Sequence, residues 1–214
     1  MWACPHCRLA LLASPHGASL VCAKGHTFDR AREGYVHLLP ANRKRSPEPG
    51  DNPQMVAARR RVHDAGTYRR LADAVVDELA GLPLRGGVLD LGCGEGYYTA
   101  VLARALPGTV LCGVDISRTA VRLAANRCAA AEFAVASAYQ LPVPDASLDA
   151  VVRVFAPSDD AEVRRVLKPG GYYLEVCPAP RHLWQVRAML YDLSLIHISE
   201  PTRRACRSRM PSSA

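Results

Sequence analysis

Three glycines at alternate positions follow a carboxylate near the middle of the chain. Gly92, Gly94 and Gly96 come after Asp90 in the pattern D-x-G-x-G-x-G. Dinucleotide sites use G-x-G-x-x-G instead, because those glycines serve a pyrophosphate and the packing of a helix. A carboxylate just before the first glycine suits a cationic ligand better than a pyrophosphate. S-adenosylmethionine (SAM) carries a cationic amino group and a sulfonium, so the spacing predicts a SAM site.

The alternative for this loop is an ordinary glycine turn that binds no ligand. Two residues further along the chain favour a ligand site. Asp115 ends an apolar run about twenty residues beyond the loop, where ribose hydroxyls are held in this architecture. Ser137 ends a shorter apolar run and is placed to meet the adenine edge. Both residues therefore join the predicted SAM contacts.

A second constellation near the N-terminus has the composition of a metal site. Cys4 and Cys7 form a C-x2-C pair, and Cys22 and His26 follow as C-x3-H. Three thiolates and one imidazole give Zn2+ a closed tetrahedral shell. A segment of about 40 residues cannot build an adequate core alone, so the metal would supply much of its folding energy. In the alternative interpretation the four side chains are free or form disulfides.

Five apolar runs must position the residues of the glycine loop. We expect strands at 88–91, 110–115, 134–137, 150–155 and 172–177. Helical patterns alternate with these runs, which is typical of an α/β fold with a doubly wound, mostly parallel sheet. The predicted fold is therefore Rossmann-like, as in class I SAM-dependent methyltransferases, with a small zinc-binding domain in front.

The basic charge of the chain lies mainly in its first third. The net charge is +7 over 214 residues, and residues 1–70 hold twelve Lys and Arg against five Asp and Glu. Residues 71–193 hold eleven against fourteen, so the predicted SAM domain is mildly acidic. This asymmetry favours a polyanionic partner for the N-terminal part. The alternative is a solvated basic linker.

Other features of the sequence exclude several classes of protein. No apolar run approaches the roughly 18 residues that a membrane span needs, so we expect no membrane partner. The N-terminus lacks the basic and apolar regions of a secretory signal, which favours a cytoplasmic location. In that reducing setting the eight cysteines are not expected to form four disulfides.

The sequence resembles the 23S rRNA (guanine-N1)-methyltransferase family over roughly residues 3 to 193. The matching blocks are Cys4-x2-Cys7, Cys22-x3-His26, Phe28-Asp29, Glu33 to Pro40, Lys44-Arg45-Ser46, Pro49-Gly50-Asp51, Ala58-Arg59-Arg60, Gly66-x-Tyr68, Asp90 to Thr99, and Pro180-Arg181-His182-Leu183. The glycine loop is common to many methyltransferases. The specific parts are therefore the cysteine and histidine cluster and the blocks at 33–40 and 44–51.

The resemblance implies a zinc-containing RNA-recognition module joined to a SAM domain, with 23S rRNA as partner. It implies methylation of N1 of one guanine in a hairpin loop, where the Watson–Crick edge is reachable. It also implies that Tyr68 and His182 enclose SAM alongside Gly94 and Glu95. The oligomeric state is left open, with a homodimer as one alternative.

The acceptor side of such a site is expected after the fourth strand. Phe155 is a candidate to stack on the base, and Pro157 stands where many base methyltransferases carry an acceptor loop. We expect direct displacement of the methyl group by N1, with alignment and exclusion of water supplying most of the rate. Asp159 and Asp160 are tempting bases, but carboxylates are ordinary in the first turn of a helix. No catalytic base is assigned.

The sequence thus predicts four segments. They are a zinc-binding RNA-recognition domain at 1–40, a basic linker with helices at 41–80, an incomplete SAM domain at 81–193 and a tail at 194–214. The tail is similar to translated sequencing-adapter DNA, so we expect a truncated gene product with an artefactual end; the alternative is a true disordered tail. Two other functions stay open, a small-molecule SAM methyltransferase and a non-catalytic zinc-containing RNA-binding protein.

Overall fold

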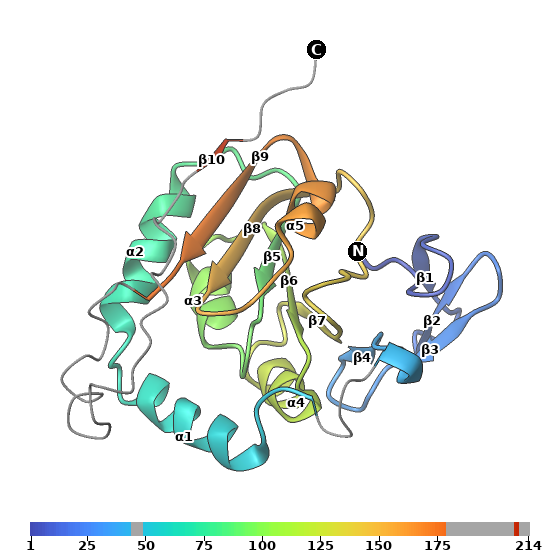
Figure 1. The fold of residues 1–214 in the computed structure, drawn as a ribbon, viewed down its shortest axis with the longest axis horizontal. Helices are drawn as coiled ribbons and strands as arrows, with labels where there is room; N and C mark the ends of the chain where they lie inside the picture. Colours follow the sequence, from blue (N-terminus) through green and yellow to red (C-terminus); the bar gives the residue numbers. More distant parts are fainter. Residues whose placement is uncertain (44–48, 179–207, 210–214) are drawn as a thin grey trace, which may run out of the picture.

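The computed structural model describes residues 1–43, 49–178 and 208–209 (Figure 1). Its N-terminal part contains a small antiparallel sheet of three strands in the order β1-β2-β3. These strands are β1 (Leu11–Ala13), β2 (Ser19–Cys22) and β3 (Thr27–Asp29). Short strands with little apolar area cannot hold a fold together alone, so this sheet depends on other contacts.

The central sheet confirms the predicted doubly wound arrangement. Its strand order is β10-β9-β8-β5-β6-β7-β4, and the pairs from β4 to β9 are all parallel. The strands are β4 (Val36–His37), β5 (Gly87–Leu91), β6 (Val110–Asp115), β7 (Glu132–Val135), β8 (Leu148–Val154), β9 (Leu167–Val176) and β10 (Ser208–Arg209). The order reverses between β5 and β8, so the ends of these strands form the expected ligand-binding edge.

Two differences from the predicted strands are informative. Strand β9 begins at Leu167 rather than at 172, because α5 runs directly into it and Gly170 takes a positive φ of 77° within the strand. The two-residue strand β4 was not predicted, since Val36 and His37 are too few to show a pattern. It pairs in parallel with β7 and thereby brings the N-terminal segment into the central sheet.

The helices are α1 (Pro53–Asp64), α2 (Arg69–Ala80), α3 (Tyr97–Ala105), α4 (Arg118–Arg127) and α5 (Asp160–Val166), with a 3-10 turn η1 (Ala41–Arg43). Helix α1 starts at Pro53 because the side chain of Asn52 caps it, accepting a hydrogen bond from the Met55 N–H at 2.9 Å. No helix of the described ranges is long and apolar enough to cross a membrane.

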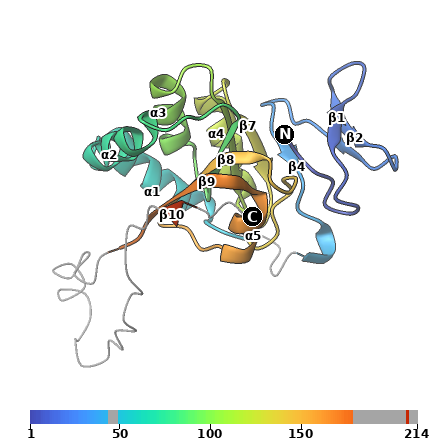
Figure 2. The same cartoon turned by 90° about the horizontal axis from the view of Figure 1, so that it is seen from above.

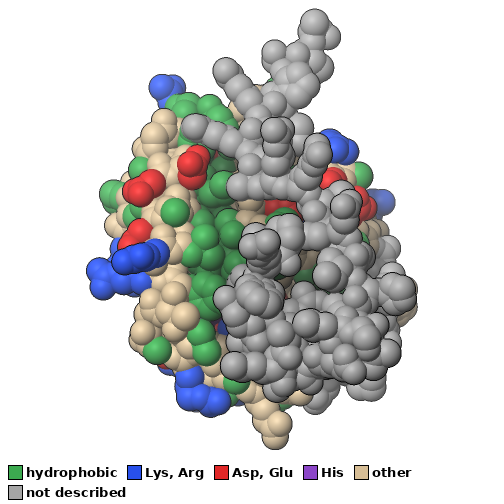
Figure 3. Space-filling view, turned by 60° about the vertical axis from the view of Figure 1, so that its left-hand side comes forward, with side chains coloured by type: hydrophobic (Ala, Val, Ile, Leu, Met, Phe, Trp, Pro, Cys, Tyr) green, Lys and Arg blue, Asp and Glu red, His purple; other side chains and the backbone are tan. Residues whose placement is uncertain are grey.

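The two faces of the central sheet are covered differently (Figure 2). Helices α2 and α3 pack on one face, where Val75 and Leu79 meet alternate residues of β5 and β8 such as Val88. Figure 3 brings the α2 side forward, where acidic and basic side chains lie along the left of a band of hydrophobic ones. The visible part of this outer surface therefore carries a mixture of positive and negative side chains.

The other face of the sheet is covered by α5 and by the N-terminal part. Trp2 is 1% exposed, and it shares one continuous cluster with Leu20 of the small sheet and Leu89 of the central sheet. Leu38, just after β4, belongs to the same cluster. Burying each such side chain contributes roughly 1.5–3 kcal/mol. The N-terminal segment and the Rossmann-like part therefore share a core as well as a sheet.

Candidate functional site

The glycine loop between β5 and α3 has the backbone that its sequence predicts. Gly92 and Gly96 have φ angles of 76° and 81°, which L side chains rarely adopt. A Cβ atom at Gly92 would clash with the Cβ of Ala156, and one at Gly96 would lie 2.9 Å from the Cα of Ala124 in α4. The loop therefore packs closely against both the segment after β8 and helix α4.

Asp115 at the end of β6 holds this loop in place. Its Oδ2 accepts a hydrogen bond from the Gly94 N–H at 3.0 Å, and its Oδ1 accepts one from the Ser117 N–H at 2.8 Å. Burial raises the pKa of Asp115 although both hydrogen bonds favour the carboxylate. A cationic or hydroxyl-rich ligand nearby would stabilise the ionised form further.

One cavity of about 300 Å3 brings several predicted site residues together. Its lining includes Gly92, Gly94, Asp115, Ser137, Phe155 and Pro157, together with Tyr139 and the linker residues Gly50, Asp51 and Arg59. The predicted cofactor contacts and the predicted acceptor residues thus face the same space. The linker contribution was missed, although the block at 49–51 already stood out in the sequence. Arg59 and Asp51 form an ion pair at 2.8 Å there.

Asp90 lies beneath the loop and does not line the cavity. It is 3% exposed and accepts a hydrogen bond from the hydroxyl of Thr99 at 2.5 Å. Burial raises the pKa of Asp90 to about 6, and the neighbouring charge of Asp115 adds to this effect. Asp90 therefore lies in the core behind the glycine loop and does not face the cavity.

The carboxylate of Glu95 is also directed into the protein. Its Oε1 lies 2.7 Å from His63 Nδ1, and its Oε2 lies 2.8 Å from Arg127 Nε. Arg127 contacts Asp64 as well, at 2.7 Å. Sequence reasoning missed His63 and Arg127, since a histidine in a basic helix and an arginine at a helix end carry no distinctive pattern.

Two aromatic residues meet beside the cavity, and of these Phe155 belongs to its lining whereas Tyr68 does not. Tyr68, at the start of α2, has its ring centroid 6.1 Å from that of Phe155 in an edge-to-face arrangement. Phe155 is 36% exposed and has a φ of 53°, a strained conformation for a non-glycine residue. Its N–H donates to the Val176 carbonyl at 3.0 Å, which holds the strained backbone in place. His182, predicted to enclose SAM, lies outside the described residues.

The predicted metal ligands converge on one point in the N-terminal part. The ligand atoms of Cys4, Cys7, Cys22 and His26 all lie within 4.8 Å of one another. Cys4 Sγ and Cys22 Sγ are 3.4 and 3.3 Å from His26 Nδ1, and Cys7 Sγ is 3.6 Å from Cys22 Sγ. A tetrahedral zinc with bonds of about 2.0–2.3 Å requires ligand separations of about 3.5–3.8 Å. The donor set therefore fits Zn2+.

Cys22 is prepared to act as a thiolate. Desolvation opposes its ionisation, but hydrogen bonds from the backbone at Lys24 and His26 outweigh this and lower the pKa to about 6. The thiolate is the form that binds zinc, so the loop favours metal binding at neutral pH.

Comparison with protein families supports both parts of this architecture. The family model described as "Methyltransferase domain" matches residues 88–171, which contain the glycine loop and Asp115. The model described as "RlmA, N-terminal", a zinc ribbon, matches residues 2–47 and includes all four metal ligands. The predicted zinc-binding domain and SAM domain are thus both confirmed as family features.

Solved structures agree with the fold. A putative S-adenosyl-L-methionine-dependent methyltransferase from Methanococcus maripaludis is 17% identical, with a TM-score of 0.53 over 69% of this chain and 75% of that one. A complex of the Haloferax volcanii Trm112 methyltransferase activator with a putative methyltransferase matches at 26% identity and a TM-score of 0.52, covering 64% of this chain and 68% of that one.

The curated relatives with similar sequences point to one particular type of methyltransferase. A 23S rRNA (guanine(748)-N(1))-methyltransferase from Streptomyces fradiae is 38% identical over 184 residues, 84% of this chain and 64% of its own length. Putative 23S rRNA (guanine-N(1)-)-methyltransferases from Micromonospora griseorubida and Bacillus subtilis are 37% and 34% identical, over 84% and 89% of this chain. The chain spans 64%, 68% and 69% of these three relatives. By this similarity the chain belongs to the 23S rRNA (guanine-N1)-methyltransferase family, confirming the resemblance seen in its sequence.

Proposed function

We propose that this protein transfers the methyl group of SAM to N1 of a guanine in a hairpin loop of 23S rRNA. The observation that carries the proposal is the single cavity that joins the glycine loop and Asp115 to Phe155 and Pro157. A methyl transfer needs donor and acceptor in line within one space that excludes water. The names of the curated relatives support this choice of acceptor.

The cofactor side of the cavity suits SAM in charge and shape. Asp115 offers carboxylate oxygens for ribose hydroxyls, and Ser137 offers a hydroxyl on the neighbouring strand end. Gly92 and Gly94 present backbone at the cavity wall, and at Gly94 an added Cβ would meet no protein atom within 4 Å, so a ligand can approach the backbone closely there. SAM, when bound, supplies an electrophilic methyl group on its sulfonium. We propose that Glu95 and Asp90 support this loop from behind.

The acceptor side suits a planar base taken out of its stack. Phe155 and Tyr139 are 36% and 57% exposed at the cavity, so their rings are available for stacking. We propose that Phe155 stacks on the guanine, and that Pro157 shapes the wall that receives it. Asp159 caps helix α5, since its Oδ1 accepts from the Ala161 N–H at 2.8 Å. This favours a structural role for Asp159, and no residue is proposed as the base.

The zinc ribbon is proposed to help recognise the RNA. The metal would fix the loops that carry Cys4, Cys7, Cys22 and His26, and the shared core would fix the ribbon relative to the catalytic cavity. A cytoplasmic location follows from an rRNA substrate. Tyr68 and, in the segment outside the described residues, His182 are proposed to close over SAM.

A transfer assay with the full chain tests the proposed function. Methyl-labelled SAM is offered with 23S rRNA that lacks the modification and, separately, with a mixture of small metabolites. The proposal expects label in the RNA and none in the metabolites, and Asp115→Asn should lower the transfer at least tenfold. Label in small metabolites alone would establish a small-molecule methyltransferase instead. RNA binding without any transfer would support a non-catalytic binding protein.

A further inference from the structure

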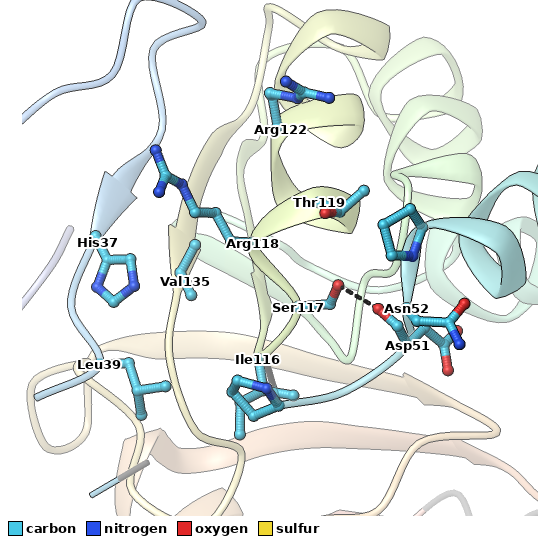
Figure 4. A pocket seen from close by; sticks show the side chains of 12 residues that line it. His37, Leu39, Asp51, Asn52, Ile116, Ser117, Arg118, Thr119, Arg122 and Val135 are labelled. Atoms are coloured by element: carbon cyan, nitrogen blue, oxygen red, sulfur yellow. Dashed lines mark hydrogen bonds between the residues drawn. The ribbon is translucent and has the colours of Figure 1, made fainter. Parts of the chain in front are cut away.

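A second cavity lies beside the first, at the seam between the N-terminal part and the Rossmann-like part. It has a volume of about 410 Å3. Figure 4 shows that His37 from β4 stands on one side and Asn52, just before α1, on the other. Arg118 and Arg122 extend from α4 above them. Three segments that are far apart in the sequence therefore build one recess.

The charge of this recess is positive. Arg118 and Arg122 lie one turn apart on α4, and both are exposed. The Nε of Arg118 donates a hydrogen bond to the hydroxyl of Tyr35 at 3.2 Å, which orients the guanidinium without neutralising it. Within the described residues neither arginine forms a close ion pair, although the charge of Glu33 acts on Arg118 and offsets part of its positive charge. Asp51, the acid among the described lining residues, is already paired with Arg59 at 2.8 Å.

Hydrogen-bond donors accompany this charge. The hydroxyl of Thr119 and the side-chain amide of Asn52 line the same recess. The Ser117 hydroxyl is already committed, since it donates to the Asp51 carbonyl at 2.9 Å and thereby ties α4 to the linker. Guanidinium groups with neutral donors beside them match a phosphate, whose oxygens accept several hydrogen bonds.

The recess also stands close to the proposed reaction. Asp51 and Ile116 line both this recess and the cofactor cavity, so the two spaces are neighbours across a thin wall. A polyanion seated in the recess would therefore lie next to the end of the cofactor cavity that Asp51 and Ile116 line. SAM itself is cationic, so it is repelled by the two arginines and attracted by Asp115.

We propose that this recess binds a backbone phosphate of the RNA strand that carries the target guanine. The inference rests on the proposed function and adds a contact that sets the register of the strand. Phosphate contacts fix the position of a nucleic acid, while contacts with bases supply the sequence information. One phosphate held by Arg118 and Arg122 would anchor the RNA strand beside the cavity that contains the proposed acceptor residues.

The arginines of α1 are largely paired within the protein, which makes the positive charge of Arg118 and Arg122 on α4 more important for RNA binding. Arg59 and Arg60 pair with Asp51 and Asp64, so much of the basic charge of the linker helix is neutralised within the protein. Arg118 and Arg122 instead belong to the part of the chain that is mildly acidic overall. The RNA-binding surface therefore crosses from the N-terminal part onto the Rossmann-like part.

The test compares the double variant Arg118→Gln/Arg122→Gln with wild type as full chains. A matched control, Arg70→Gln/Arg104→Gln, removes the same charge from exposed positions on α2 and α3. The affinity for a 23S rRNA hairpin is measured over a series of salt concentrations, and SAM affinity is measured in parallel. A plot of the logarithm of the RNA association constant against the logarithm of the salt concentration has a negative slope. Losing one phosphate contact should make this slope shallower by about 0.7.

For the double variant we expect RNA binding about tenfold weaker at physiological salt, with SAM affinity changed less than twofold. The control should keep the wild-type slope. Equal slopes and affinities in both variants would overturn the proposal, even with methylation of rRNA by the wild type intact. If wild type fails to bind or methylate rRNA at all, the proposed function itself has failed.

Two further measurements keep the test decisive. Arg122→Gln alone changes an exposed side chain that forms no side-chain hydrogen bond or ion pair within the described residues, so it serves if the double variant unfolds. Inorganic phosphate should weaken RNA binding to wild type more than to Arg122→Gln. Tight binding of inorganic phosphate with no effect on RNA affinity would assign the recess to a small anion and contradict the RNA contact.

Discussion

His63 Nδ1 lies 2.7 Å from Glu95 Oε1, which fastens the linker helix α1 to the glycine loop itself, just before α3 begins. The His63 ring also stacks on Tyr97, with centroids 4.4 Å apart and planes within 13°. Arg127 reaches the other oxygen of Glu95 from α4. Helices α1 and α4 and the start of α3 therefore meet at one carboxylate.

Replacing Glu95 should destabilise the protein strongly. The Glu95 side chain is 1% exposed, so Glu95→Ala would leave Arg127 and His63 partly buried without their partner. We expect the free energy of unfolding in urea to fall by about 3 kcal/mol. Glu95→Gln keeps one acceptor and should cost less. Glu132→Ala, whose half-exposed pair with Arg30 spans 3.9 Å, is the control and should cost under about 1 kcal/mol. Equal losses at Glu95 and Glu132 would contradict the buried role.

Asp90 should make the stability of the ligand-free protein depend on pH. Its pKa of about 6 in the folded state lies above the ordinary 3.8, so folding favours the protonated form. This contribution is complete below about pH 4 and is lost as pH rises through 6, a change of about 3 kcal/mol. The amide side chain of Asp90→Asn does not titrate, so this pH-dependent change in stability is absent from the variant.

The stability of Asp90→Asn relative to wild type should therefore improve between pH 4.5 and pH 7.5, as measured by denaturant unfolding without SAM. Because the charge of Asp115 helps to raise the pKa of Asp90, the comparison reports the titration of Asp90 together with its coupling to Asp115. A difference that stays constant across this pH range would show that Asp90 does not titrate within it and would contradict the prediction.

Phe155 allows stability and activity to be separated. Glycine tolerates a φ of 53° without strain, so Phe155→Gly should leave the melting temperature within a few degrees of wild type. The same change removes the ring proposed to stack on guanine, worth about 1–3 kcal/mol per base. Methyl transfer at subsaturating RNA should then fall roughly tenfold to a hundredfold. Unchanged transfer by a folded Phe155→Gly protein would remove Phe155 from the acceptor site.

Removing zinc should destabilise the whole chain rather than the ribbon alone. Trp2 and Leu20 share a cluster with Leu89 of the central sheet, so loosening the ribbon opens the common core. We expect a chelator to lower the melting temperature measured by circular dichroism in a single transition, and Cys22→Ser to have the same effect. A chelated protein with an unchanged transition would show that the four ligands hold no structural metal.

The sequence predicted the parts of the site that depend on local pattern. The glycines and Asp115 were predictable because strand ends and turn residues recur at fixed spacing, and Cys4 to His26 because zinc ligands do. The strand Val36–His37 was not predictable, since two residues carry no periodicity and only the tertiary fold pairs them with β7. The partners of Glu95 and the recess at Arg118 and Arg122 likewise depend on how distant segments pack. The segment boundaries and the roles of all the site residues, His182 included, remain predictions.

Mapping the methyl group by reverse transcription tests the central claim most directly. A methyl group on guanine N1 blocks Watson–Crick pairing, so reverse transcriptase stops one nucleotide before it. After incubation of unmodified 23S rRNA with SAM and wild-type protein, we predict a new stop before a single guanine in a hairpin loop. The stop should be absent with Asp115→Asn and without SAM. Transfer of label into the RNA with no such stop, or stops spread over many guanines, would contradict the account.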